Sequence, residues 1–152
     1  MFIKGKVNKN QGTGKMTRKF FIGMVSAMLM MVACDKEKYQ VIPYVPVYMT
    51  VDLNITNELT VTGNSVYFRG AGYAGVIVYC EFPGSWYAFD AACTHEKDPQ
   101  LPVVIDGPLA TCPRCGSQYM LMGGGQPLKG PATQPLQPYH VSSTGNLLRI
   151  YN

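Results

Sequence analysis

The fold is decided by residues 93–119, which read CTHEKDPQLPVVIDGPLATCPRCGSQY. Two short pairs of metal-ligand residues stand in this stretch, Cys93-x-His95 and Cys112-x-x-Cys115, and sixteen residues separate His95 from Cys112. Thiolate and imidazole are the usual ligands for zinc and for the iron of iron–sulfur centres. Each pair fits one tight loop, so two such loops that face each other can enclose a metal ion or a small cluster. The stretch therefore predicts a metal centre.

The spacing of the two pairs resembles the Rieske [2Fe–2S] motif, in which Cys-x-His is followed after about sixteen residues by Cys-x-x-His. Cys93, His95 and Cys112 match the first three ligands, whereas Cys115 stands where the family has its second histidine. The family's Gly-Ser-x-Tyr then follows in register as residues 116–119. The resemblance implies a [2Fe–2S] cluster on a Cys₃His set, with Cys93 and Cys112 on one iron. His95 and Cys115 would hold the other iron.

The substituted ligand changes the charge expected at the centre. Iron, sulfide and two thiolates sum to zero in an oxidised Rieske centre with neutral histidines, so the third thiolate from Cys115 leaves one negative charge. An anion accepts an electron less readily, and the reduction potential should fall toward that of all-cysteine ferredoxins. Ser117 and Tyr119 match family residues that donate hydrogen bonds to sulfur of the centre, which raises the potential and partly opposes this effect.

The resemblance extends beyond the ligand loops to about residues 66–151. Residues 75–90 match the family's strand–turn–strand entry into the first loop, residues 130–136 match its proline-rich loop, and residues 139–150 match its closing hairpin. No segment after residue 34 has a long helical period, and Gly, Pro and Tyr are plentiful, as in short strands joined by tight turns. We therefore expect an all-β, Rieske-like fold of stacked small antiparallel sheets, with two cluster-binding loops at one tip.

Individual strands are predicted from local pattern. Apolar side chains alternate along residues 45–53, and residues 59–61 and 66–68 look like two short strands around a hairpin-type turn at Gly63-Asn64. Residues 76–82 form the strongest strand pattern, and Pro83-Gly84 turns the chain into a further strand over residues 86–89.

Four residues outside the ligand set also call for an interpretation. Many exported Rieske proteins carry an extra cysteine in each ligand loop, and the two form a disulfide; Asp98 and Arg114 stand at those positions here. Cys80 lies in an apolar strand and is interpreted as a buried small hydrophobic residue. His140 is interpreted as a structural or exposed residue rather than a ligand, because it lies far from the ligand loops in sequence.

The first part of the chain has a different composition. Residues 1–33 carry six basic residues and no acid, which leaves seven basic against nine acidic residues in the remainder. That remainder gives no electrostatic case for a nucleic-acid partner. Residues 1–15 are polar, and synthesis could begin either at Met1 or at Met16.

A signal peptide is predicted from about Met16. Thr17-Arg18-Lys19 forms a short basic region, and residues 20–32 form an apolar core that is short for a membrane span. The core ends in Met31-Val32-Ala33-Cys34, which resembles the bacterial lipobox, whose cysteine is lipidated and becomes the mature N-terminus. An uncleaved membrane anchor is the alternative. The basic region also resembles a twin-arginine export signal with Lys19 in place of the second arginine.

These observations predict three parts of the chain: a leader over 1–33, a tether over 34–44, and a Rieske-like iron–sulfur domain over 45–152. The protein would lie in the cell envelope, held on a bacterial membrane by a lipid on Cys34, with the domain outside the cytoplasm.

The expected function is electron transfer with an unidentified redox protein partner. No catalytic dyad or substrate-pocket signature is visible, so the domain alone is not expected to be an enzyme. Two alternatives remain open, a zinc-binding domain and a cluster-free Rieske fold, each with a structural or interaction role, since Cys₃His is also a common closed zinc set.

Overall fold

The computed structural model describes residues 41–152, and these belong to one compact unit, Tyr39–Asn152. The leader, the cleavage and lipidation predicted at Cys34, and the tether as far as residue 40 lie outside the described residues. Within the described part of the chain, no helix is long and apolar enough to cross a membrane.

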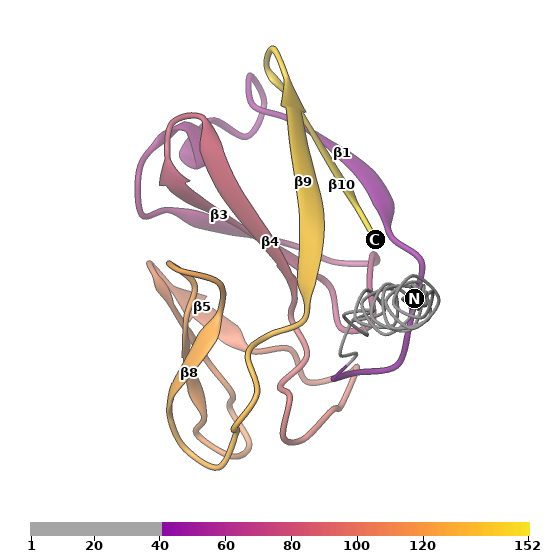
Figure 1. Ribbon diagram of the computed structural model, residues 1–152, viewed down its shortest axis with the longest axis vertical. Coiled ribbons are helices and arrows are strands. Elements are labelled where there is room, and N and C mark those ends of the chain that lie inside the picture. Colours follow the sequence, from indigo (N-terminus) through magenta and orange to yellow (C-terminus); the bar gives the residue numbers. More distant parts are fainter. Residues whose placement is uncertain (1–40) are drawn as a thin grey trace, which may run out of the picture. The chain divides into compact units, whose positions relative to one another are not determined.

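A six-stranded antiparallel sheet forms the larger part of the domain (Figure 1). Its strands, in spatial order, are β1 (Tyr48–Asp52), β10 (Leu147–Tyr151), β9 (Pro138–Thr144), β4 (Ser85–Asp90), β3 (Val76–Phe82) and β2 (Ser65–Phe68). Each neighbouring pair is antiparallel. The closing strand β10 lies between the first strand β1 and β9, so both ends of the described chain are tied into the sheet.

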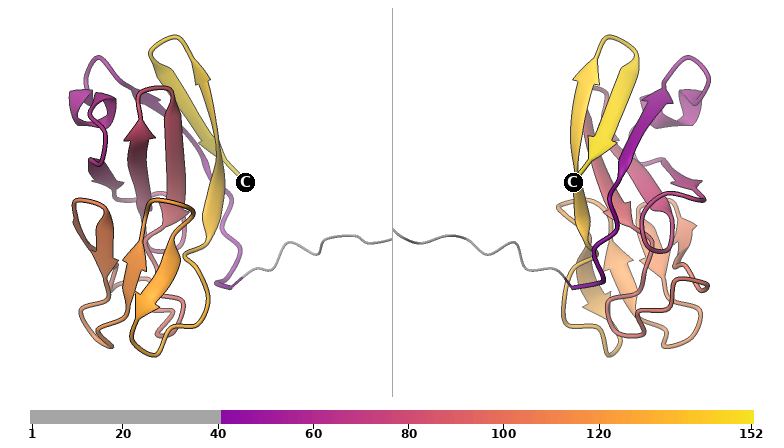
Figure 2. Two further views of the ribbon diagram at one scale, coloured as in Figure 1. Left: turned by 60° about the vertical axis from the view of Figure 1, so that its left-hand side comes forward. Right: turned by 90° about the vertical axis from the view of Figure 1, so that its right-hand side faces the viewer.

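A smaller antiparallel sheet lies below the first in Figure 1, drawn in orange. It contains β5 (Val104–Asp106), β6 (Leu109–Thr111), β7 (Gln118–Met120) and β8 (Gln126–Lys129), in that order. Figure 2 shows the two sheets stacked along the long direction of the domain, with connecting loops gathered at the lower end. Two of these loops carry the candidate ligands: the β4–β5 loop and the β6–β7 loop.

Strand β3 is central to the core because it is buried on both faces. Val76 and Val78 pack in one hydrophobic cluster, and Ile77 and Tyr79 pack in another on the opposite face. Alternate side chains of a strand point to opposite faces, so burial on both sides requires an unbroken apolar run. The second cluster extends to Cys93 and Cys112 and thereby supports the ligand loops from beneath.

Most of the predicted strands are present. The strand over 76–82 is confirmed with the same bounds, as are the turn at Pro83-Gly84 and the closing hairpin. Gly84 has φ 101°, a backbone conformation that other residues rarely adopt. Cys80 is fully buried, as predicted, and burial raises the pKa of its thiol.

The strand predicted over residues 59–61 is wrong, and so is the hairpin with it. Residues Asn57–Thr60 form a short 3₁₀ helix, η2, instead. Leu59 is fully buried there, and its carbonyl accepts a hydrogen bond from Trp86 Nε1 at 2.8 Å. Gly63 and Asn64 pair with Cys80 on β3 rather than closing a hairpin. Packing of one leucine and one tryptophan thus overrides a local strand preference.

Candidate metal centre

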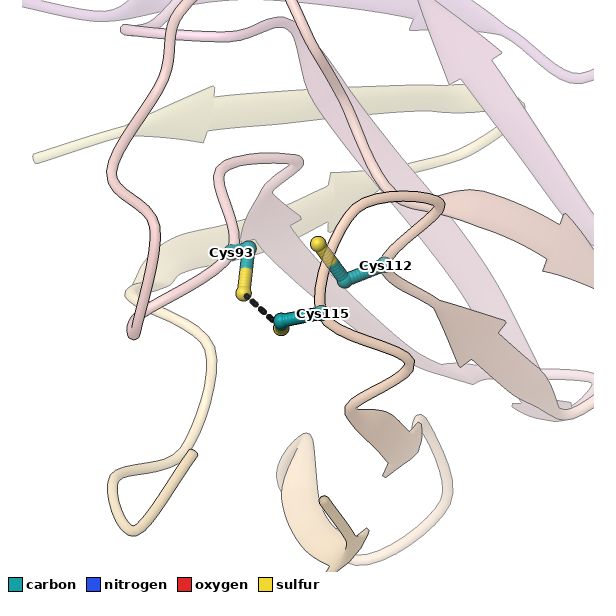
Figure 3. Close-up of side chains that lie close together, drawn as sticks. All are labelled: Cys93, Cys112 and Cys115. Atoms are coloured by element: carbon teal, nitrogen blue, oxygen red, sulfur yellow. Dashed lines mark hydrogen bonds between the residues drawn. The ribbon is translucent and has the colours of Figure 1, made fainter. Parts of the chain in front are cut away.

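Three cysteine thiols converge from the two ligand loops. Cys93 follows the end of β4, whereas Cys112 and Cys115 stand between β6 and β7. Their sulfur atoms all lie within 4.8 Å of one another, and Cys93 Sγ is 3.6 Å from Cys115 Sγ. Figure 3 shows the three side chains close together, with Cys93 on one loop and with Cys112 and Cys115 on the other. Cys93 and Cys112 are buried and Cys115 is half-buried, so the sulfurs are largely shielded from water.

The second ligand loop is closed by its own backbone. Cys112 N–H donates to the Ser117 carbonyl at 2.8 Å, and Gly116 N–H donates to the Cys112 carbonyl at 3.0 Å. Gly116 has φ 70° and has open space where a Cβ would stand. The glycine is therefore needed for its left-handed backbone conformation rather than for a close approach. This turn sets Cys112 and Cys115 on the same side of the loop.

Ser117 connects the second loop to the proline-rich loop. Its side chain is fully buried, accepts a hydrogen bond from Ala132 N–H at 3.1 Å, and lies 3.1 Å from Cys115 Sγ. Because the serine oxygen already accepts from Ala132, its own proton is available to the sulfur. Gly130 makes this contact possible, since a Cβ on it would lie 2.5 Å from the Ser117 Cα.

Tyr119 connects β7 to the first ligand loop. Its hydroxyl accepts a hydrogen bond from Thr94 N–H at 3.1 Å and lies 3.3 Å from Cys93 Sγ and 3.0 Å from Thr94 Oγ1. Thr94 Oγ1 in turn donates to the Gln134 carbonyl at 2.8 Å. With the threonine proton used in this way, the Tyr119 proton has two acceptors, the Thr94 oxygen and the Cys93 sulfur. The ring itself is fully buried.

These surroundings affect the thiols unequally. Burial raises the pKa of Cys112 to about 11, against opposing hydrogen bonds from the backbone of Cys115 and Arg114. Burial acts in the same direction on Cys115, but hydrogen bonds from Ser117, followed by Cys112 and Cys93, outweigh it and lower the pKa of that thiol. Burial, followed by the contact with Cys93, raises the pKa of the Tyr119 hydroxyl. Cys115 is thus the thiol that its surroundings stabilise as a thiolate.

His95, the fourth predicted ligand, is exposed and does not belong to the group formed by the three sulfurs. The family resemblance implies that Cys93 and Cys115 bind different iron atoms, whereas the structure brings these two sulfurs to 3.6 Å. His140, on β9, is also exposed, and its ring lies tilted beside that of Tyr151 with ring centres 5.4 Å apart.

The donors present fit a soft-metal centre. Three sulfurs converge from two loops, and two hydroxyl groups, those of Ser117 and Tyr119, are directed at them. Hydrogen bonds of this kind stabilise thiolate ligands. Each buried side-chain nitrogen and oxygen in the described residues has a hydrogen-bond partner, so the hydroxyls are held in place by the fold.

Sequence reasoning missed Asp90, which anchors the start of the first ligand loop. Its fully buried carboxylate accepts hydrogen bonds from the backbone N–H groups of Tyr73, Ala74 and Ala92, at 2.6, 3.1 and 2.8 Å. The Tyr139 hydroxyl donates a fourth bond at 2.7 Å. The missed signal was an acid at the end of a wholly apolar strand pattern, since a buried carboxylate has to be paired.

Asp98 and Arg114 stand at the positions of the missing disulfide, and the structure brings them together. Arg114 Nη2 lies 2.8 Å from Asp98 Oδ2, and Arg114 Nη1 lies 3.7 Å from Glu96 Oε2. The contact joins the two ligand loops at the surface. Beside the first loop lies an open hollow of about 460 Å³, lined by residues 67 and 69–75 together with Pro99, Gln100 and Pro102.

Comparisons with known proteins bear on the fold. No family model matches the chain, and no curated protein does either. A chain of the complex of reduced oxygenase and oxidized ferredoxin in carbazole 1,9a-dioxygenase matches with a TM-score of 0.50 and 21% identity, over 69% of this chain and 93% of that one.

Two further solved structures are similar at lower scores. The ferredoxin of carbazole 1,9a-dioxygenase from Nocardioides aromaticivorans IC177 has a TM-score of 0.45 and 20% identity, over 70% of this chain and 97% of that one. The Sphingomonas yanoikuyae B1 ferredoxin has a TM-score of 0.45 and 21% identity, over 60% and 88%. With its stacked antiparallel sheets and its two ligand loops at one tip, the chain has the all-β, Rieske-like fold that the sequence predicted.

Proposed function

We propose that this protein is a membrane-tethered Rieske-like electron-transfer protein that binds a [2Fe–2S] cluster through Cys93, His95, Cys112 and Cys115. The domain serves as an electron carrier for a redox protein partner and is not itself an enzyme. One observation carries the proposal: three thiols from two loops of a Rieske-like fold converge within 4.8 Å at one tip.

The resident group would supply one-electron chemistry, and the residues of this chain determine how easily it occurs. The Ser117 and Tyr119 hydroxyls offer hydrogen bonds to Cys115 and Cys93, and such bonds favour the reduced, more negative state. Burial of Cys93 and Cys112 keeps water from their sulfurs. His95 is exposed, so this ligand would reach the surface at which a partner docks.

The similar ferredoxin occurs in a complex with an oxygenase, which supports a protein redox partner for this chain as well. Contacts between electron carriers and their partners are small and transient, as a surface tip of two loops would provide. Residues 34–152 carry seven basic and nine acidic residues, so we propose no nucleic-acid partner for the domain.

A zinc site is the second candidate, and one distance favours it. Two thiolates on a single tetrahedral zinc ion, each bound at about 2.3 Å, lie about 3.8 Å apart. The 3.6 Å between Cys93 Sγ and Cys115 Sγ is close to that value, whereas ligands on two different irons lie farther apart. A zinc-binding or cluster-free domain would have a structural or interaction role.

Metal and acid-labile sulfide analysis of the purified protein tests the proposal. Iron and sulfide in equal amounts, with red-brown colour, are expected. Alanine at Cys93, His95 or Cys112 should abolish the visible absorption, because loss of a ligand opens an iron coordination position to water. A colourless protein with one zinc ion would favour the second candidate, and a metal-free protein would favour the cluster-free fold.

The membrane anchor is tested separately. The sequence Met31-Val-Ala-Cys34 after an apolar core predicts cleavage before Cys34 and acylation of its thiol, with the domain outside the cytoplasm. Several acyl chains on one cysteine would hold the protein stably on a membrane, where a single chain would not. Cys34→Ala should leave an unprocessed precursor without the lipid. If processed size and membrane fractionation stay unchanged, the protein is not a lipoprotein.

A further inference from the structure

The site is held together from two sides. On the inner side, Tyr119 contacts Cys93 and Thr94 and so fastens β7 to the first ligand loop. On the outer side, the guanidinium of Arg114 reaches Asp98 and Glu96 of the first loop. The three sulfurs lie in the loops that these two contacts join.

The outer contact is well placed to act on the thiols. Arg114 stands between Cys112 and Cys115, so movement of its backbone moves both. Asp98 is oriented by a contact that does not involve Arg114, because its Oδ1 accepts a hydrogen bond from Gln100 N–H at 2.9 Å. This leaves Oδ2 to accept from Arg114 at 2.8 Å, a charge-assisted hydrogen bond of good length.

The strength of the ion pair that Arg114 forms with Asp98 and Glu96 limits the effect that it can have. The Arg114 side chain is 51% exposed and the carboxylates 26%, so solvent and salt weaken the attraction. The free energy that such a solvent-exposed ion pair contributes is too small to determine whether the domain folds. It is large enough to change the population of a locally open state, in which the two loops separate while both sheets remain intact.

We propose that Arg114 and Asp98, with Glu96 beside them, form an ionic latch between the two ligand loops. The latch holds the outer side of the thiol site closed and so limits the access of reagents and chelators to the sulfurs. Arg114 and Asp98 are positioning residues, since they act on Cys112 and Cys115 through the loops. The part that concerns metal retention rests on the proposed function; the part that concerns loop closure does not.

The latch is tested first on the metal-free, fully reduced protein, by the rate at which iodoacetamide alkylates Cys112 and Cys115. Arg114→Gln should accelerate alkylation by roughly three- to tenfold, and Arg114→Asp should accelerate it more, because it repels Asp98. Removal of a cation by itself disfavours thiolate and slows alkylation. An acceleration therefore reports opening of the loops.

Charge reversal provides the decisive comparison. The double variant Arg114→Asp with Asp98→Arg restores an opposite-charge pair and should return the alkylation rate to near that of the parent. Raising the salt to 1 M should accelerate the parent and leave Arg114→Gln unchanged, because salt screens exposed pairs. Arg149→Gln, the same change at an exposed position on β10, serves as the control and should have no effect.

The same variants, purified with their bound metal, are then mixed with a chelator, and metal release is timed. Faster release from Arg114→Gln, reversed in the double variant, supports the latch. Unchanged alkylation in Arg114→Gln and Arg114→Asp, or an acceleration that the reversed pair does not correct, overturns it. Failure to purify any metal would count against the proposed function alone, because the alkylation experiment needs none.

Discussion

Cys115 is the residue at which this site departs from the motif it resembles. It is half-buried, its thiol lies 3.1 Å from Ser117 Oγ, and its surroundings lower its pKa. A cysteine that the fold stabilises as a thiolate is suited to be a ligand. Its negative charge would then be a permanent part of the centre, where histidine would contribute none.

Replacement of Cys115 by histidine should therefore raise the reduction potential. All-cysteine and two-histidine centres differ by about 250 mV or more, so one of the two exchanges should contribute about 125 mV or more. The sign follows from removal of one negative charge next to the iron, where little water screens it. Redox titration beside the parent protein measures the shift. A lower or unchanged potential with an intact cluster would remove Cys115 from the ligand set.

At the scale of elements, the second ligand loop depends on the loop that follows β8. Ala132 N–H fixes the Ser117 hydroxyl, and Gly130 passes close enough to Ser117 that any Cβ would overlap it. Gly130 also has φ 93°, in the left-handed region. The position of Ser117 against Cys115 is thus set by a segment outside the motif.

Gly130→Ala should destabilise the domain and displace Ser117 from Cys115. Gly70→Ala is a matched control, because Gly70 has φ 88° and nothing within 4 Å of its Cβ position. The backbone cost of about 1–2 kcal/mol is common to both, and the overlap should cost Gly130→Ala about 1–3 kcal/mol more. Urea unfolding measures the difference. Equal losses of stability in the two variants would show that the contact with Ser117 has relaxed.

At the scale of the whole molecule, buried thiol and tyrosine hydroxyl groups make the stability of the fold depend on pH in the alkaline range. Burial raises the pKa of the Cys80 and Cys112 thiols, and burial followed by the hydrogen bond to Asp90 raises the pKa of the Tyr139 hydroxyl. A group whose pKa is higher in the folded protein than in the unfolded chain contributes its full stabilisation at pH values below the pKa of the unfolded chain. That contribution is lost as pH rises toward the folded value, because the unfolded chain releases the proton first.

The free energy of unfolding of the metal-free, reduced protein should therefore fall above pH 9, the ordinary thiol value, and more steeply above pH 10, the ordinary tyrosine value. Tyr139→Phe should reduce the slope above pH 10 by up to about 1.4 kcal/mol per pH unit and leave the slope between pH 9 and 10 unchanged. Urea titrations at several pH values measure both slopes. An unaltered slope above pH 10 would mean that Tyr139 ionises equally in both states.

The sequence by itself determined the features that depend on residues close together in the chain. The spacing of Cys93, Cys112 and Cys115 identified the loops that meet, and the apolar run over residues 76–82 identified strand β3. Such patterns suffice because the alternation of side chains along a strand and the backbone conformation of a tight turn depend on neighbouring residues. The strands of the four-stranded sheet were missed, since three or four residues are too few to show a period.

Only the tertiary structure decided which distant groups act on those loops. The capture of Asp90 by Tyr73, Ala74 and Tyr139, and the pairing of Arg114 with Asp98, join residues 16 to 49 positions apart. The resemblance placed Asp98 and Arg114 at matching positions of the two loops, but local pattern does not show that their side chains form an ion pair, and it names no partner for Asp90. The bonds to Asp90 form where packing buries its carboxylate beside hydrogen-bond donors, since a buried carboxylate cannot remain unpaired. The Arg114–Asp98 pair forms at the surface, where the two ligand loops meet.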